Sequence, residues 1–106
     1  MAKKTIMLVC SARMSTSMLV QRMQEAAKKK GLDAEIFAVG AGSAEEHIHS
    51  QKIDVLLLGP QIRYMKSDFE KRFGSKNIPI DVIQMTDYGT MNGEKVLSFA
   101  ESLIKE

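Results

Sequence analysis

With 106 residues, 44% of them apolar, the chain is long enough for one domain with a single core and too apolar for a disordered protein. The near balance of 15 basic and 13 acidic residues, a net charge of +2, argues against nucleic acid as the main partner. A single cysteine, Cys10, cannot form an internal disulfide, and no apolar run approaches the ~20 residues of a membrane-spanning helix. We therefore expect one cytoplasmic domain over residues 1–106.

The first half of the chain alternates short apolar runs with segments of helical period. Residues 6–9 are continuously apolar, which is typical of a strand buried on both faces. A helix is expected from Ser15 to Lys30, with Met18, Leu19 and Met23 on its apolar face, and Gly31 ends it. Residues 34–39 form a second predicted strand. Ser43 and Glu46 then have the spacing of a capping box that opens a short helix.

The second half repeats this alternation. Residues 55–58 and 80–83 are predicted strands. Gly59 and Pro60 mark a turn and the start of a helix with an apolar face, and a last helix has apolar residues at helical spacing from Val96 to Ile104. Residues 74–77 and 86–93 are predicted loops. The eight methionines are assigned mostly to apolar helix faces.

This alternation predicts an α/β fold with a four-stranded parallel sheet, strand order 2-1-3-4, and helices on both faces, a three-layer arrangement of the Rossmann or flavodoxin-like type. Ligands of such sheets bind beyond the carboxyl ends of the strands. Cys10 stands at the carboxyl end of the first strand, so it is the first candidate for a functional residue.

The residues after Cys10 have the composition of an anion-binding loop. They are hydroxyl-rich and precede a helix N-terminus, whose backbone N–H groups have no partner inside the helix and can hold a tetrahedral anion. The helix dipole also favours a thiolate. The sequence therefore predicts a nucleophilic Cys10 beside a phosphate-binding segment formed by Ser11, Ala12, Arg13, Met14, Ser15, Thr16 and Ser17.

These motifs resemble the IIB components of the bacterial sugar phosphotransferase system, in the lactose/cellobiose (N,N'-diacetylchitobiose) family. The loop of that family reads Cys-x-x-Gly-Met-Ser-Thr-Ser, and this chain matches it at Cys10 and at residues 14–17. Residues 57–65 and 88–97 resemble two further stretches of the family. The resemblance spans nearly the whole chain.

The resemblance implies that Cys10 is a phosphocysteine. It would receive a phosphoryl group from a phosphohistidine of the IIA component and pass it to a sugar held by the membrane component IIC. The sugar is expected to be a β-linked disaccharide such as cellobiose or chitobiose. The protein would be a phosphotransferase, a kinase-type phosphoprotein of sugar transport with a P-loop-like site, acting as a monomer without cofactor or metal.

Arg13 departs from the family pattern, which has glycine at that position. It either adds positive charge for phosphate or an acidic partner, or is an outward-pointing loop residue that replaces glycine. Met14, Pro60, Gln61 and Tyr88 are candidates for the partner-docking surface. His47 and His49 are two residues apart, which separates them on a helix and disfavours a shared metal ion.

Three other functions are compatible with parts of the pattern. Low-molecular-weight tyrosine phosphatases and arsenate reductases also place a cysteine after the first strand, but they need Cys-x5-Arg, and Thr16 stands at that arginine position. A flavodoxin-like or receiver domain would need stacking aromatic residues or acidic residues at the strand ends, and Gly59 ends the third strand. A regulatory domain that is phosphorylated only as a sensor remains the third alternative.

Overall fold

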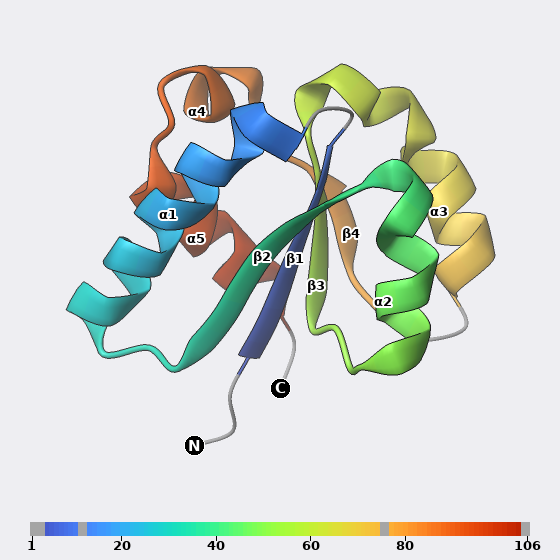
Figure 1. Cartoon of the computed structure of the whole chain (residues 1–106), viewed down its shortest axis with the longest axis horizontal. Coiled ribbons are helices and arrows are strands. Elements are labelled where there is room, and N and C mark those ends of the chain that lie inside the picture. Colours follow the sequence, from blue (N-terminus) through green and yellow to red (C-terminus); the bar gives the residue numbers. More distant parts are fainter. Residues whose placement is uncertain (1–3, 11–12, 75–76, 105–106) are drawn as a thin grey trace.

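A four-stranded parallel sheet forms the centre of the molecule (Figure 1). The computed structural model describes residues 4–10, 13–74 and 77–104, with the backbone alone for residues 13–16. The strands are β1 (Lys4–Cys10), β2 (Ala34–Gly40), β3 (Val55–Leu58) and β4 (Ile80–Val82). Their order is β2-β1-β3-β4, and every neighbouring pair is parallel, which confirms the predicted sheet.

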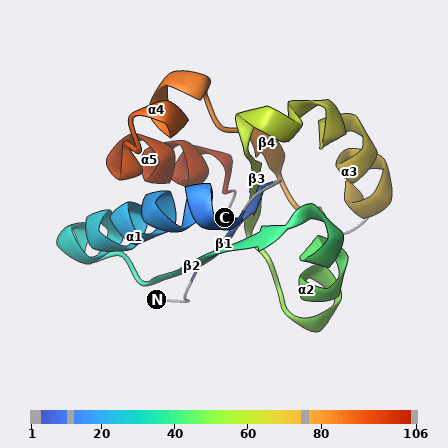
Figure 2. The same ribbon diagram turned by 45° about the horizontal axis from the view of Figure 1, so that its top comes forward.

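Helices cover both faces of this sheet. Figure 2 shows α1 (Arg13–Lys30) and α5 (Gly93–Leu103) together on one face, and α2 (Ala44–Ser50) and α3 (Lys66–Phe73) on the other. A short helix α4 (Met85–Gly89) and the 3-10 helices η1 (Ala41–Ser43) and η2 (Pro60–Met65) complete the order of elements. The predicted three-layer architecture is therefore confirmed.

The alternation of side chains along β1 divides the core into two parts. Ile6 and Leu8 pack in the cluster that faces α1 and α5, while Met7 and Val9 pack in the cluster under α2 and α3. All four side chains are completely buried. A strand buried on both faces has no polar face, which is why its sequence is continuously apolar.

Three predictions about helices are wrong in detail. The helix expected from Ser15 begins at Arg13, because arginine is a better helix former than the glycine that the family pattern has at this position. Ser43 makes no side-chain cap hydrogen bond, since η1 precedes α2 and occupies the capping position. The loop expected at residues 86–93 contains α4, which forms because Tyr88 is buried among core residues and its N–H donates to the carbonyl of Gln84, at 2.9 Å.

The prediction for the methionines is also wrong. Met7 and Met23 are fully buried, but Met18 and Met85 are 49% and 63% exposed. Met18 has the spacing of the apolar face of α1, yet no layer of the structure covers it. Periodicity therefore identified which residues could be buried and not which of them are.

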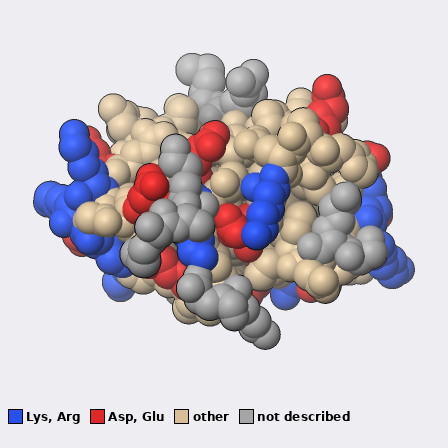
Figure 3. Space-filling model, turned by 90° about the horizontal axis from the view of Figure 1, so that it is seen from below, with Lys and Arg blue, Asp and Glu red and all other residues tan. Residues whose placement is uncertain are grey.

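The amino ends of the strands form a face of mixed charge, which Figure 3 views directly. Basic side chains gather at the side where α1 ends, in the run Lys28, Lys29 and Lys30, and Lys30 pairs with Glu101 of α5. At the same end of the sheet, Asp54 Oδ2 accepts a hydrogen bond from Thr5 N at 2.8 Å, as expected for a turn residue. Within the described ranges, no helix combines the length and apolar character needed to cross a membrane.

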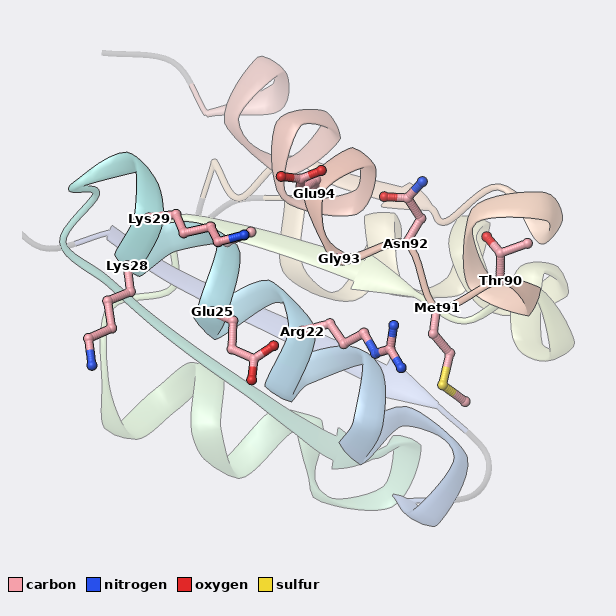
Figure 4. Close-up of a pocket in the computed structure, with 10 residues that line it drawn as sticks. Arg22, Glu25, Lys28, Lys29, Thr90, Met91, Asn92, Gly93 and Glu94 are labelled. Carbon is pink, nitrogen blue, oxygen red and sulfur yellow. The ribbon is translucent and has the colours of Figure 1, made fainter.

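The contact between α1 and α5 depends on the absence of a side chain at Gly93. A Cβ atom at this position would lie 2.5 Å from the carbonyl carbon of Arg22 and 2.7 Å from the Arg22 oxygen. Figure 4 shows the segment from Thr90 to Glu94 facing Arg22 and Glu25 of α1. Gly93 is the first residue of α5, so any side chain there would push the two helices apart at the start of α5.

We predict that Gly93→Ala lowers the free energy of unfolding by ~1–3 kcal/mol, because backbone atoms of α1 cannot move away from the added methyl group. Urea unfolding followed by circular dichroism measures this. Gly89→Ala is the matched control, since a Cβ there meets nothing within 4 Å, and its stability should stay within ~0.5 kcal/mol of the parent. Equal stability of the two variants would contradict the close approach.

Candidate functional site

Cys10 lies at the carboxyl edge of the sheet, between two glycines. It is paired in register with Gly40 at the end of β2. On its other side, Gly59 follows β3 and donates its N–H to the carbonyl of Val9, at 2.8 Å. Neither neighbour has a side chain that could fill the space beside the cysteine.

The N-terminus of α1 stands directly after this strand end. Arg13 is its first residue, three positions after Cys10, so residues 13–16 of the predicted phosphate-binding segment lie in the first turn of the helix. That turn contains no acidic residue, so no carboxylate competes with an anion for the positive end of the helix dipole. Ser17 is exposed on the same helix. Ser11 and Ala12 lie outside the described residues, as do the side chains of Arg13, Met14, Ser15 and Thr16.

The side chain of Cys10 is covered rather than open to solvent. Only 2% of the residue is exposed. Cys10 nevertheless belongs to neither of the two apolar clusters found among the described residues. It is therefore a buried residue at the carboxyl end of β1 that belongs to neither cluster.

Gln61 lies close to Cys10 across Gly59. A Cβ atom at Gly59 would be 3.1 Å from Gln61 Oε1 and 3.6 Å from Cys10 Cβ. Pro60 and Gln61 were expected at this edge, and the structure places Gly59 and Gln61 beside Cys10. Pro60 is buried, whereas Gln61 is exposed. The position of Gly59 beside Cys10 was not expected from the sequence, although the Gly-Pro pair at a strand end was the available signal.

Other candidate residues fall into two groups. Tyr88 belongs to α4 and is 9% exposed within the cluster that packs on α1 and α5. It can therefore support the residues of a docking surface but has little surface of its own for a partner to contact. Three large apolar side chains are exposed on the segments that follow β1, β3 and β4: Met18, Tyr64 and Met85. Met18 was expected on the buried face of its helix, and the sequence gives no direct signal for the exposure of any of the three, because exposure depends on what packs around them.

A separate hollow lies between α1 and the segment that joins α4 to α5 (Figure 4). Charged side chains of α1 line it, among them Arg22, Glu25 and Lys29, and neither Cys10 nor Gln61 contributes to it. Its mixed charge is not that of an anion site. Among the residues that the structure describes, no three His, Cys, Asp or Glu side chains come together as metal ligands.

Residues 5–99 match the family model described as PTS system, Lactose/Cellobiose specific IIB subunit. Two proteins of Lactococcus lactis are each 49% identical to the chain over 107 residues, covering 98% of it and 99% of their own length. One, from subsp. cremoris strain MG1363, is a PTS system galactose-specific EIIB component. The other, from subsp. lactis strain IL1403, is a PTS system cellobiose-specific EIIB component.

Solved structures show the same fold. The solution structure of a cellobiose-specific phosphotransferase IIB component from Borrelia burgdorferi has a TM-score of 0.79 at 46% identity, over 97% of this chain and 93% of that one. A lactose-specific IIB domain from Streptococcus pneumoniae has a TM-score of 0.86 over 98% of this chain and 100% of that one, but at 15% identity it supports the fold alone. The chain belongs to the lactose/cellobiose-specific IIB family, the phosphotransferase subunits that work with IIA and IIC components in a sugar-specific phosphotransferase system.

Proposed function

We propose that Cys10 carries the phosphoryl group in this system. The Cys10 sulfur attacks the phosphorus of a phosphohistidine on IIA, so an S–P bond forms, the N–P bond breaks and the thiol proton is released. In the second step a sugar hydroxyl bound by IIC attacks the same phosphorus. The O–P bond forms, the S–P bond breaks, and the hydroxyl proton leaves. Such transfers need positioning and charge stabilisation more than covalent catalysis.

One observation carries this proposal: a cysteine ends the central strand, and a helix begins three residues later without an acidic residue in its first turn. The backbone N–H groups of that turn lack partners within the helix, and the dipole favours both thiolate and phosphate. Ser11 to Ser17 are the proposed phosphate-binding residues. The proposal leaves both roles for Arg13 open. Thr16 offers no guanidinium to promote hydrolysis, which distinguishes the site from that of the cysteine phosphatases.

The burial of Cys10 places a condition on this mechanism. Both the donor histidine and the acceptor sugar must reach the sulfur in line with the bond that breaks, and a residue that is 2% exposed does not allow this. The proposal therefore requires that docking uncovers the sulfur. Between these encounters the covering groups would limit the access of water and slow the loss of the phosphoryl group.

The sugar proposed is a β-linked disaccharide such as cellobiose or chitobiose. The relatives differ in this respect, since a galactose-specific and a cellobiose-specific component are equally identical to the chain. Selectivity is therefore assigned to IIC, which holds the sugar. We further propose a cytoplasmic monomer, because a carrier that alternates between two partners must keep the same edge free for each.

We predict that Cys10→Ser and Cys10→Ala fail to accept a phosphoryl group from phosphoenolpyruvate, the general phosphotransferase proteins and the cognate IIA. Intact-protein mass spectrometry before and after incubation measures this. The serine hydroxyl keeps the geometry but is a far weaker nucleophile than a thiolate at neutral pH.

The control for this prediction is the fold of each variant, followed by circular dichroism and thermal unfolding. Ser67→Ala changes an exposed hydroxyl on α3 and should be phosphorylated like the parent. Phosphorylation of a folded Cys10→Ser protein at the parental level would overturn the assignment of Cys10.

The exposed apolar side chains suggest where IIA docks. Met18, Tyr64 and Met85 lie on segments next to the Cys10 edge, and exposed methionines adapt to changing partners. Gln61 is exposed among them, and the proposal retains Met14 in this surface. Pro60 and Tyr88 are buried, so they would shape the surface without direct contact.

We predict that Tyr64→Ser raises the KM for phosphorylated IIA about three- to tenfold, with kcat within about twofold, because an exposed aromatic contact is lost and the reacting groups are unchanged. Steady-state transfer assays measure both constants. Lys52→Ser, at the opposite edge of the sheet, is the control and should leave KM unchanged. A fall in kcat alone would contradict a docking role for Tyr64.

A further inference from the structure

We propose that Gln61 is a catalytic residue, whose carboxamide hydrogen-bonds to the phosphoryl group on Cys10, and that Gly59 leaves the space in which this contact forms. The inference rests on the proposed phosphorylation of Cys10. It assigns one wall of the phosphate site to the segment after β3, on the side of Cys10 opposite to β2.

The distances around Gly59 carry this inference. The point at which a Gly59 side chain would begin is 3.1 Å from Gln61 Oε1 and 3.6 Å from Cys10 Cβ. Gln61 Oε1 and Cys10 Cβ can therefore be no further apart than the sum of these two distances. A phosphoryl group on the sulfur adds an S–P and a P–O bond beyond the Cβ–Sγ bond, and this length is sufficient for its oxygens to reach a carboxamide at that separation.

The chemistry of a carboxamide suits both states of the cysteine. Its oxygen accepts a hydrogen bond and its NH2 group donates two, so rotation about the terminal torsion of Gln61 presents either group to the same neighbour. The thiol of unphosphorylated Cys10 would donate a hydrogen bond to the carboxamide oxygen. A phosphoryl oxygen would accept one from the carboxamide NH2 group. The group is also neutral, and a neutral donor holds a phosphoryl group less tightly than a guanidinium or ammonium group would, which favours release to the next acceptor.

The backbone holds Gln61 in place for this role. Gly59 N donates to Val9 O at 2.8 Å, which ties the turn to β1, and Ile62 N donates to Gly59 O at 3.0 Å. Pro60 and Ile62, the residues on either side of Gln61, are both buried. The exposed side chain of Gln61 therefore starts from a fixed point beside Cys10.

The test compares the parent with Gln61→Ala, Gly59→Ala and the double variant. Gly59 has φ −64°, which alanine adopts freely, so the added methyl group acts by displacing the Gln61 carboxamide. Each protein is phosphorylated to equilibrium with the phosphorylated IIA, and the ratio of the two phosphoproteins is measured. Loss of one hydrogen bond to a charged group should shift this ratio toward IIA about tenfold in each single variant.

The double variant should be no worse than either single one, since both changes remove the same contact. The phosphorus NMR shift of the isolated phosphoprotein should also change in all three variants. Gln84→Ala is the matched control: an exposed glutamine at the same edge, beyond β4 and so two strands away from β1, which should leave the ratio and the NMR shift unchanged.

The outcomes separate this inference from the proposed function. A parent that takes no phosphoryl group on Cys10 would overturn both. Normal phosphorylation of Gln61→Ala, with an unchanged ratio and NMR shift, would overturn the role of Gln61 and leave that of Cys10 intact. Additive effects of Gly59→Ala and Gln61→Ala would contradict the shared contact.

Discussion

The burial of β1 on both of its faces is the constraint on which the rest of the structure depends. Residues 6–9 have no exposed surface, and alternate side chains of this strand enter the two apolar clusters. Because β1 pairs with both β2 and β3, its register sets which residues meet at the carboxyl edge. Cys10 lies between Gly40 and Gly59 for this reason, and α1 begins where the strand has just left the core.

In its proposed role, the buried position of Cys10 at the end of β1 addresses two opposing requirements of a carrier. The group must be reachable by two large partners in turn, and it must not be lost to water between them. A cysteine at a strand end is shielded by its neighbours, while the lack of side chains at Gly40 and Gly59 limits the bulk beside it. A thiol further inside the strand would be shielded from water but out of reach of a partner. A thiol on the exposed side of α1 would be within reach of a partner but open to water.

The two edges of the sheet have different chemical character. At the amino edge, ion pairs and turn hydrogen bonds such as those of Lys30 and Asp54 join neighbouring elements. At the carboxyl edge, exposed Met18, Tyr64 and Met85 lie on the segments that leave the strands. The carboxyl edge, where Cys10 lies, therefore keeps apolar surface that a partner can cover.

Strand positions, the order of elements and the candidate nucleophile followed from the amino-acid sequence, because buried parallel strands are continuously apolar and a cysteine before a helix start has few structural reasons to be there. Motif spacing also indicated the family. The presence of α4 and the exposure of Met18 depended on tertiary packing. Periodicity reports which side chains could face a neighbour, and only the assembled layers decide whether a neighbour is there. Tertiary structure also decides the proximity of Gln61 to Cys10. The two residues lie at the ends of different strands, and local sequence does not encode the distance between them.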